Sequence, residues 1–284
     1  MVIASIPSPD TGTIDLGPFV VHMYGLMLLL AIAACVGLTG IRYVRRGGDW
    51  DLVLRVAVWG VAFGIVGARL YHDLTSWNEV PDPKWKGIFE VWKGGLGVWG
   101  GIGLGCLVGA IVAHRSGASV ARLADCVAPG LLVAQGIGRF GNWWNQELFG
   151  KPTDLPWGLE IDPENRPIDF VDKETFHPTF LYEALWCFGA AGLLLLIERW
   201  FKGRIRPGNL FALYVLVYSV GRLWIETLRI DPSHELGGIR LNVFVAAAAI
   251  VLSAAFFVVW QKRWKRGASG PAPKVETMAV PKGR

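Results

Sequence analysis

Charged residues are scarce in this chain. Asp, Glu, Lys and Arg together make up 18% of the 284 residues, whereas a soluble domain has roughly 25%. Hydrophobic residues make up 52%, and 14 residues are Trp. A soluble domain would interrupt its apolar runs with charge, but the runs here are long enough to cross a bilayer. The composition therefore argues against a soluble protein and favours a membrane protein.

Cysteine pairs with metal-ligand spacing are also missing. The four cysteines, Cys35, Cys106, Cys126 and Cys187, all lie within apolar segments, and no two of them form a CxxC pattern. We therefore expect neither a disulfide framework nor a zinc site, but small buried side chains. The sequence also contains no nucleotide-binding loop, so no metal and no cofactor is predicted.

Lys and Arg are absent from the first 17 positions. The first apolar run, Phe19 to Ile41, is longer than the about 7 to 15 residues of a signal-peptide core, so we expect it to be retained as a span. The formal net charge is +5, but the basic residues gather in short clusters between apolar runs. This distribution fits the inner surface of a membrane and does not indicate binding of nucleic acid.

Seven apolar stretches of about 20 residues can each cross a membrane as a helix. They are Phe19 to Ile41, Leu52 to Tyr71, Gly94 to Ala113, Leu123 to Trp144, Pro178 to Ile197, Gly208 to Leu228 and Leu241 to Trp260. The predicted fold is therefore an all-α polytopic membrane protein. Small residues let membrane helices approach closely, and the spacing of Gly101, Gly105 and Gly109 predicts a packing face.

Basic residues are unevenly divided between the two alternate sets of connections. The set that contains the C-terminal tail holds 17 Lys and Arg, and the other set holds 8. Because cytoplasmic loops carry the excess of Lys and Arg, we expect the N-terminus outside and the C-terminus in the cytoplasm. An odd number of spans agrees with this orientation.

The longest outside connection, residues 145–177, is rich in acidic residues and proline. It predicts a small extracytoplasmic head on a membrane domain that covers residues 1–266. Residues 267–284 are small, basic and contain proline, so we expect a disordered cytoplasmic tail.

Three arginines, Arg69, Arg139 and Arg222, fall within the predicted spans. Arg69 is near the end of its span, where its side chain can reach the outer interface. Arg139 has Asn142 and Gln146 at positions i+3 and i+7, so a helix would place all three on one face.

Arg222 is followed at i+4 by Glu226, with which it can form an ion pair on one helix. The structural alternative is a buried ion pair that only fixes helix packing. Arg139 and Arg222 come from different helices near the same outer surface, and guanidinium groups bind phosphate oxygens in a bidentate manner. In a bilayer the abundant anion is a lipid headgroup, so the two arginines predict a headgroup site.

The stretch Gly138 to Gly150 resembles the signature of the prolipoprotein diacylglyceryl transferase family, G-R-x-G-N-[aromatic]-x-N-x-E-x-x-G. The fixed positions are filled by Gly138, Arg139, Gly141, Asn142, Asn145, Glu147 and Gly150. Further similarity, in the same order as in the family, is seen at Tyr24 to Leu26, Gly94 to Leu96, His177 to Glu183 and Gly221 to Glu226. The resemblance thus covers nearly the whole chain.

The resemblance implies a seven-span enzyme of the bacterial inner (plasma) membrane whose active site faces the extracytoplasmic side. Its partners would be the lipid bilayer, phosphatidylglycerol and a prolipoprotein signal peptide with a lipobox cysteine. The diacylglyceryl group would pass from the lipid to the cysteine thiol, forming a thioether and releasing glycerol phosphate. This would be the first step of lipoprotein maturation.

The resemblance also implies roles for single residues. Catalysis is assigned to Arg139, Arg222, Glu147 and Asn142, and phosphatidylglycerol binding to Arg139, Asn142, Asn145, Tyr24, Gly150 and Glu226. In one place the chain departs from the family, because Trp99 stands where many members have a histidine that has been treated as a base. Tryptophan cannot accept a proton, so this chain activates the thiol differently or needs no dedicated base.

Two other classes of protein are compatible with arginines inside a membrane. A small transporter or channel for an anionic solute would be expected to contain two repeated halves with broken helices, and no second copy of the Arg139 segment is present. A noncatalytic membrane assembly subunit would not need the cluster of Arg, Asn and Glu.

Overall fold

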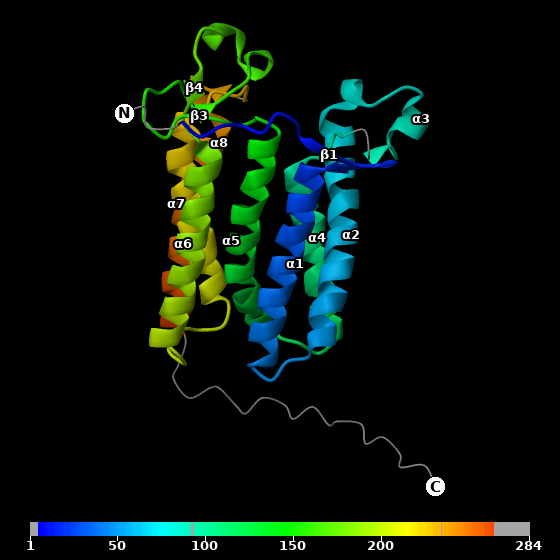
Figure 1. Cartoon of the computed structure of the whole chain (residues 1–284). Coiled ribbons are helices and arrows are strands. Elements are labelled where there is room, and N and C mark those ends of the chain that lie inside the picture. Colours follow the sequence, from blue (N-terminus) through cyan, green and yellow to red (C-terminus); the bar gives the residue numbers. More distant parts are fainter. Residues whose placement is uncertain (1–4, 92–93, 234, 264–284) are drawn as a thin grey trace.

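The computed structural model describes residues 5–91, 94–233 and 235–263 (Figure 1). The predicted tail, 267–284, lies outside this range. Seven described helices are long and apolar enough to cross a membrane. They are α1 (Met23–Val44), α2 (Trp50–Thr75), α4 (Val98–Arg115), α5 (Val120–Trp144), α6 (Thr179–Trp200), α7 (Asn209–Leu228) and α8 (Leu241–Lys262). The predicted helical membrane fold is therefore confirmed.

Two of the predicted spans begin four residues too early. Phe19–His22 forms strand β2, which pairs antiparallel with β1 (Thr13–Leu16); the β-branched Val20 and Val21 favour this extended backbone. The third span begins at Val98 instead of Gly94, because Gly94 and Gly95 adopt φ values of +88° and +71° that no helix accommodates.

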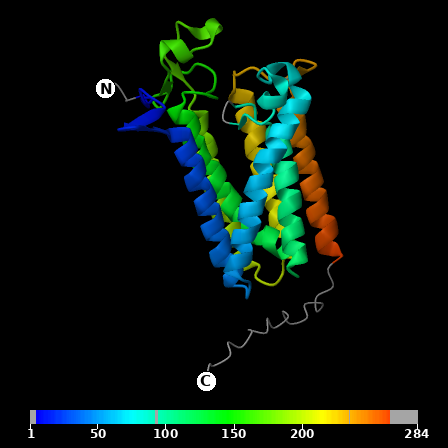
Figure 2. The same ribbon diagram turned by 90° about the vertical axis from the view of Figure 1, so that its right-hand side faces the viewer.

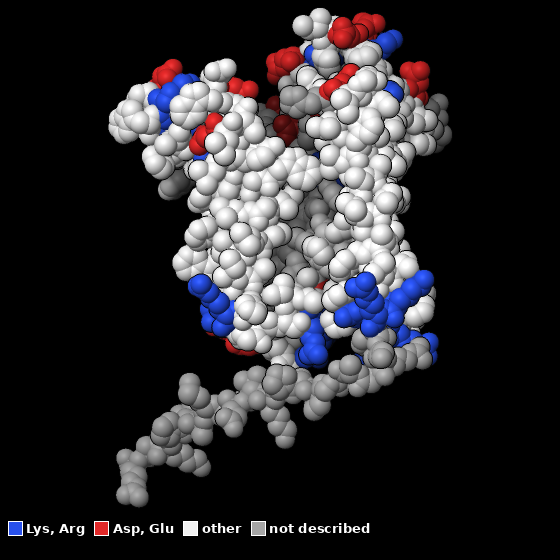
Figure 3. All heavy atoms as spheres, turned by 180° about the vertical axis from the view of Figure 1, so that it is seen from behind, with Lys and Arg blue, Asp and Glu red and all other residues white. Residues whose placement is uncertain are grey.

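The long helices alternate in direction between two ends of the molecule (Figure 1). One end carries the connection 145–177 and is called here the head end; the opposite end, where α1 joins α2, is called the tail end. Helices α1 and α2 meet at the tail end and separate toward the head end (Figure 2). Lys and Arg gather at the tail end and acidic residues at the head end (Figure 3).

Glycines bring α2 and α4 into close contact. A Cβ added at Gly67 would lie 2.4 Å from the carbonyl oxygen of Gly100, and one at Gly105 would lie 2.9 Å from that of Gly60. Real Cβ atoms do not approach this closely, so these positions require glycine. The prediction that Gly101 and Gly105 serve helix packing is confirmed.

A buried cluster joins α5, α6 and α7. Its members are small or aliphatic and lie below the head end: Ala128, Leu132, Cys187, Ala190, Ala191, Leu194 and Leu210. Close packing of these helices fixes the relative positions of the polar residues that follow on the same helices toward the head end.

The connection 145–177 caps the head end with its own small core. Strands β3 (Leu159–Glu160) and β4 (Thr175–Phe176) pair antiparallel, and the N-terminal segment adds to them through Ile6. The core consists of Phe149, Leu159, Ile161, Phe176 and Phe180. The cap also contains two short 3₁₀ helices, Pro163–Asn165 and Ile168–Phe170. Two further small elements near the head end are α3 (Lys84–Gly87) and the β5–β6 hairpin (Glu235–Leu236 with Ile239–Arg240).

The first predicted span ends at Ile41, but α1 continues to Val44, and Arg42 lies within it and is buried. Its Nη2 donates to Glu198 on α6 at 2.7 Å and to the carbonyl of Asp125 on α5 at 3.0 Å. Arg46 also pairs with Glu198. At the tail end, Arg42 thus links α1 to α5 and α6, and it also contributes to the basic charge of that end.

Candidate active site

Arg139 and Asn142 share one face of α5 near its head end. Nη1 of Arg139 donates to Oδ1 of Asn142 at 3.3 Å, and Nδ2 of Asn142 donates to Oε1 of Glu147 at 2.8 Å. The amide of Asn142 therefore links a guanidinium within the helix to a carboxylate at the surface. These three predicted site residues are brought together.

Glu183 of α6 was missed as a site residue, although it is the centre of the site. Its carboxylate pairs with Nη2 of Arg139 at 2.6 Å and with Nη1 of Arg222 at 3.3 Å. Glu183 is only 3% exposed. The sequence does contain a signal for Glu183, because a carboxylate within an apolar membrane helix needs a partner. Arg139 thus has a carboxylate partner that its own segment does not supply.

The predicted pair of Arg222 and Glu226 is confirmed, with Nη2 and Oε2 2.6 Å apart. Glu226 is also bound by Nε of Arg240 at 2.7 Å and by Nδ2 of Asn242 at 3.2 Å. Arg240 is the last residue of strand β6. Its guanidinium closes the site from the β5–β6 hairpin.

Arg240 extends the network into the connection between α7 and α8. Nη2 of Arg240 lies 3.0 Å from Asp231, and Arg229 binds the same carboxylate through Nε at 2.6 Å. Burial alone would raise the pKa of Asp231, but hydrogen bonds and the charges of Arg229 and Arg240 outweigh it and lower this pKa below its ordinary value.

Four guanidiniums, from Arg139, Arg222, Arg229 and Arg240, form ion pairs with three carboxylates, from Glu183, Glu226 and Asp231. A fourth carboxylate, the exposed Glu147, is joined to Arg139 through Asn142. The side chains of Arg139 and Arg222 are 20% and 17% exposed, so both are open to a ligand.

Tyr24 of α1 lies beside this network. Its side chain is close to Asn142, Arg139 and Glu147. The ring packs directly on Gly141, where an added Cβ would lie 2.8 Å from Cδ2 of Tyr24. The glycine at 141 is therefore required for Tyr24 to reach Asn142. No atom lies within 4 Å of a Cβ added at Gly138, so that glycine leaves open space next to Arg139.

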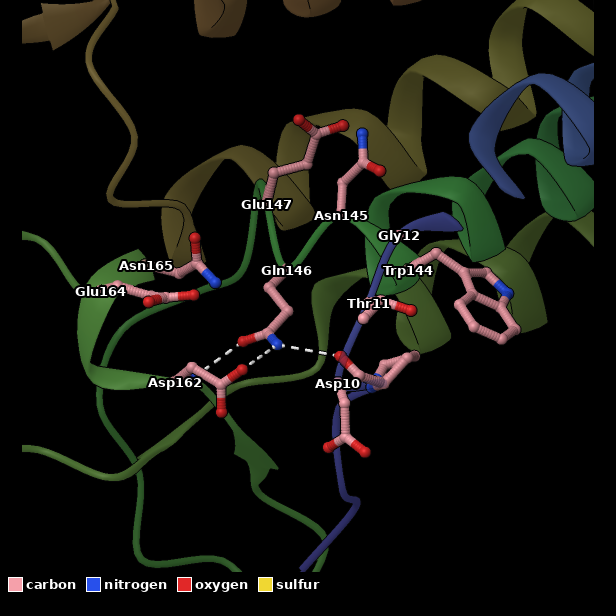
Figure 4. A pocket seen from close by; sticks show the side chains of 11 residues that line it. Asp10, Thr11, Gly12, Trp144, Asn145, Gln146, Glu147, Asp162, Glu164 and Asn165 are labelled. Atoms are coloured by element: carbon pink, nitrogen blue, oxygen red, sulfur yellow. Dashed lines mark hydrogen bonds between the residues drawn. The ribbon is translucent and has the colours of Figure 1, made fainter. Parts of the chain in front are cut away.

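A polar cavity of about 340 Å³ opens at the head end beside Glu147 and Asn145. Its other walls come from the N-terminal segment 9–12 and from residues 162–165. In Figure 4 the side chains of Asn145 and Glu147 point to one side of the chain and that of Gln146 points to the other. The cavity connects the surface with the carboxylate that binds Asn142.

Gln146 does not share the face of Arg139 as predicted. Helix α5 ends at Trp144, and Gln146 has a φ of +49°. Its Nε2 donates to Asp162 at 2.5 Å and to the carbonyl of Pro9 at 3.1 Å. The helix ends before position i+7 from Arg139. Gln146 therefore binds residues of the cap and does not lie beside Arg139 and Asn142 on the helix face.

Gly150 lies where the cap meets α6 and α7. Its amide donates to the carbonyl of His177 at 3.0 Å, and an added Cβ would lie 2.8 Å from Cβ of His177 and 3.1 Å from the carbonyl of Leu228. Close packing therefore explains why position 150 is a glycine. The predicted contact of Gly150 with phosphatidylglycerol stays a prediction. The pKa of the His177 imidazole is lowered mainly by partial burial and to a smaller extent by the positive charge of Lys151.

The prediction that Arg69 reaches the outer interface is wrong. The side chain is buried, forms an ion pair with Asp73 at 3.2 Å and donates to the carbonyl of Gly94 at 2.7 Å. It also donates to the carbonyls of Gly87, Ile88 and Gly95. Carbonyl groups of a folded-back connection replace water around this guanidinium, so Arg69 holds the segment between α3 and α4.

His72 lies in the last turn of α2. Its Nε2 would be 2.5 Å from a Cβ at Gly95, and with Arg69 it lines a cavity of about 190 Å³. Trp99, in the first turn of α4, is 54% exposed. Of these two side chains, His72 is the one that faces the Gly94–Gly95 turn. Within the described residues, no group of three or more His, Cys, Asp or Glu has the arrangement of a metal site.

Fold and site together define a multi-pass membrane protein with a cationic site inside its membrane-crossing helices. The family model described as Prolipoprotein diacylglyceryl transferase matches residues 11–260. The chain belongs to this family.

Three relatives are similar over most of their length, and each is named phosphatidylglycerol–prolipoprotein diacylglyceryl transferase. The protein of Bifidobacterium adolescentis is 42% identical over 93% of this chain and 82% of its own length. That of Streptomyces griseus is 45% identical over 92% and 79%, and that of Cutibacterium acnes is 45% identical over 95% and 92%. These names support an enzyme and do not favour the transporter alternative.

Proposed function

We propose that this protein transfers the diacylglyceryl group of phosphatidylglycerol to the lipobox cysteine of a prolipoprotein at the extracytoplasmic side of the plasma membrane. Family membership supports the reaction class. The observation that carries the site assignment is the pairing of Arg139 and Arg222, from two helices, with one nearly inaccessible carboxylate, Glu183. The guanidiniums of Arg139 and Arg222 complement the negative charge of a phosphodiester.

In the proposed reaction, the cysteine sulfur attacks the glyceryl carbon that bears the phosphate. A carbon–sulfur bond forms, the carbon–oxygen bond to the phosphate breaks, and glycerol phosphate leaves with the bonding electrons. Negative charge grows on the phosphate during this step, and guanidiniums held in place beforehand stabilise it without reorganisation. Arg139 binds the headgroup phosphate, and Arg222, oriented by Glu226 at 2.6 Å, stabilises the leaving group.

The incoming thiol needs little activation in this proposal. Its free pKa of about 8.5 requires only a modest decrease to give thiolate near neutral pH, and the nearby guanidiniums of Arg139 and Arg222 supply it. The thiol proton passes to solvent through the head cavity, beside the exposed Glu147. Asn142, Asn145 and Tyr24 donate hydrogen bonds to the headgroup.

The reaction is tested with a synthetic precursor peptide, vesicles that contain phosphatidylglycerol, and the purified protein. We expect mass spectrometry to detect a diacylglyceryl thioether on the lipobox cysteine. A peptide with serine at that position and vesicles made only of phosphatidylcholine are the controls, and neither should give the adduct. Lack of any adduct from the complete mixture would exclude the proposed function.

The proposed orientation places the head end outside the cell. It rests on the basic tail end and the acidic head end (Figure 3). Single cysteines introduced at Ile168, which is 93% exposed in the cap, and at Lys202, in the α6–α7 connection, are compared in intact cells. A membrane-impermeant thiol reagent should label Ile168→Cys and not Lys202→Cys, with the unsubstituted protein as background. The reverse pattern would invert the topology.

A further inference from the structure

Arg222 lies between two carboxylates on different helices. Its Nη1 is 3.3 Å from Glu183 of α6, and its Nη2 is 2.6 Å from Glu226 of its own helix, α7. Both carboxylates are almost completely buried, and charges interact strongly where water is excluded. Two carboxylates beside one guanidinium would more than cancel its charge unless each of them is shared with another cation.

Each of these carboxylates does have a second cationic partner. Glu183 also pairs with Arg139 at 2.6 Å. Glu226 also pairs with Arg240, whose Nε lies 2.7 Å from Oε1. The oxygen of Glu226 that accepts from Arg222 is the other one, Oε2. The Glu226 carboxylate thus binds Arg222 with one oxygen and Arg240 with the other.

The guanidinium of Arg240 is surrounded by acceptors of the protein. Besides Glu226, it contacts the carbonyl of Asp231 through Nη1 at 2.9 Å and the carboxylate of Asp231 through Nη2 at 3.0 Å. Nη1 also lies 3.3 Å from the carbonyl of Arg229. All three nitrogens therefore have acceptors, and the side chain is only 14% exposed. An effect of Arg240 on the reaction would pass through Glu226 and not through a contact with the lipid.

A tight turn brings Arg240 to this place. Gly237 and Gly238, which join β5 to β6, have φ values of +62° and +76°, and positive φ at two successive positions is typical of a two-residue hairpin. The chain therefore reverses at once, and Arg240 follows at the end of β6. Asn242, in the first turn of α8, donates to the same oxygen of Glu226 at 3.2 Å. The second partner of this buried carboxylate thus comes from a hairpin outside the membrane-crossing helices.

We infer that Arg240 is a positioning residue for the transfer step, an assignment that rests on the proposed function. By pairing with Oε1 of Glu226, Arg240 offsets the charge of this carboxylate and fixes its orientation. The guanidinium of Arg222 then stays in place and remains available to the departing phosphate. Because charge grows on the phosphate only in the transition state, the contribution of Arg240 appears in kcat more than in the KM for the lipid.

The inference is tested with two substitutions of nearly equal length: Arg240→Lys keeps the positive charge, and Arg240→Gln removes it. Neither side chain reproduces the fork that binds Asp231, so both should lower the unfolding temperature to a similar extent. In Arg240→Gln, the kcat of transfer from phosphatidylglycerol to the precursor peptide should fall by about ten- to a hundredfold. In Arg240→Lys it should fall by less than about threefold. Equal kcat values for the two variants would overturn the inference.

The decisive variant combines Arg240→Gln with Glu226→Gln, which removes the charge that Arg240 offsets. We expect this double variant to be at least about fivefold faster than Arg240→Gln, because no unbalanced carboxylate then remains beside Arg222. It should also be as fast as Glu226→Gln alone, a comparison that holds even if Arg240→Gln by itself does not fold. An arginine that only supports the fold would make the double variant slower than either single one, which would overturn the inference and leave the proposed function intact.

Arg166→Ala is the matched control. Arg166 also fastens a connection at the head end, by donating to the carbonyls of Ile161 and Val171 at 2.8 and 3.0 Å. Its removal should lower the unfolding temperature and leave kcat unchanged. A fall in kcat as large as that of Arg240→Gln would show that any loosened head-end connection slows transfer, and it would overturn the inference. Failure of the unsubstituted protein to transfer would instead overturn the proposed function as well.

Discussion

Alanine in place of Arg139 is expected to lower the rate of diacylglyceryl transfer by about a hundredfold to a thousandfold, the typical effect of one preorganised donor to a developing charge. Arg139 contacts both Asn142 at 3.3 Å and Glu183 at 2.6 Å, so its guanidinium is fixed before the lipid arrives. The measurement is the initial rate of adduct formation at saturating lipid and peptide.

Lysine at position 139 keeps the charge but is expected to be almost as poor, because an ammonium group cannot reproduce the planar fork that binds phosphate. Arg55→Ala is the control, since Arg55 is half-exposed at the tail end and pairs only with Asp51 at 3.3 Å. A wild-type rate for Arg139→Lys would show that bidentate phosphate recognition is the wrong account of this site.

Replacing Glu183 with alanine should give the largest loss of stability among the site residues. The carboxylate is almost completely buried between Arg139 and Arg222. Its removal leaves two guanidiniums facing each other in a low-dielectric environment, and breaking a buried pair in this way typically costs about 3 to 5 kcal/mol. Thermal unfolding of the purified protein in detergent measures the effect as a lower transition temperature.

Glu174→Ala removes an exposed carboxylate of the cap and is the matched control, for which little change is expected. Glu183→Gln is the second variant, because the amide retains the size and the acceptor oxygen of the original side chain. It should unfold at a temperature between those of Glu183→Ala and the unsubstituted protein. Equal transition temperatures for all four proteins would mean that the bridge between the arginines contributes nothing to stability.

The spans were predictable because each depends on a local property, the length of an apolar run. The pair of Arg222 and Glu226 was predictable for the same reason, since four residues make about one helical turn. The end of α5 at Trp144 was not predictable from a local property. The predicted position of Gln146 on the helix face was therefore wrong. Its positive φ is imposed by hydrogen bonds to Pro9 and Asp162, residues that lie far from it in the sequence.

The burial of Arg69 shows a second limit of local reasoning. Position near the end of a span indicates access to the interface only when no other segment covers that end. Here the carbonyl groups of Gly87, Ile88, Gly94 and Gly95 surround the guanidinium. That arrangement depends on the positive φ values of Gly94 and Gly95, which the sequence allows but does not require.

By itself, the sequence determined the number of membrane-crossing helices, the two arginines that are candidates for the site, and the family signature that surrounds Arg139. These features arise from composition and from spacing within single segments. Only the tertiary structure decided that Glu183 lies between Arg139 and Arg222 and that Arg240 joins Glu226. The physical reason is that a buried charge must find a partner, and in a helical bundle the partner comes from whichever helix the packing of small residues brings alongside.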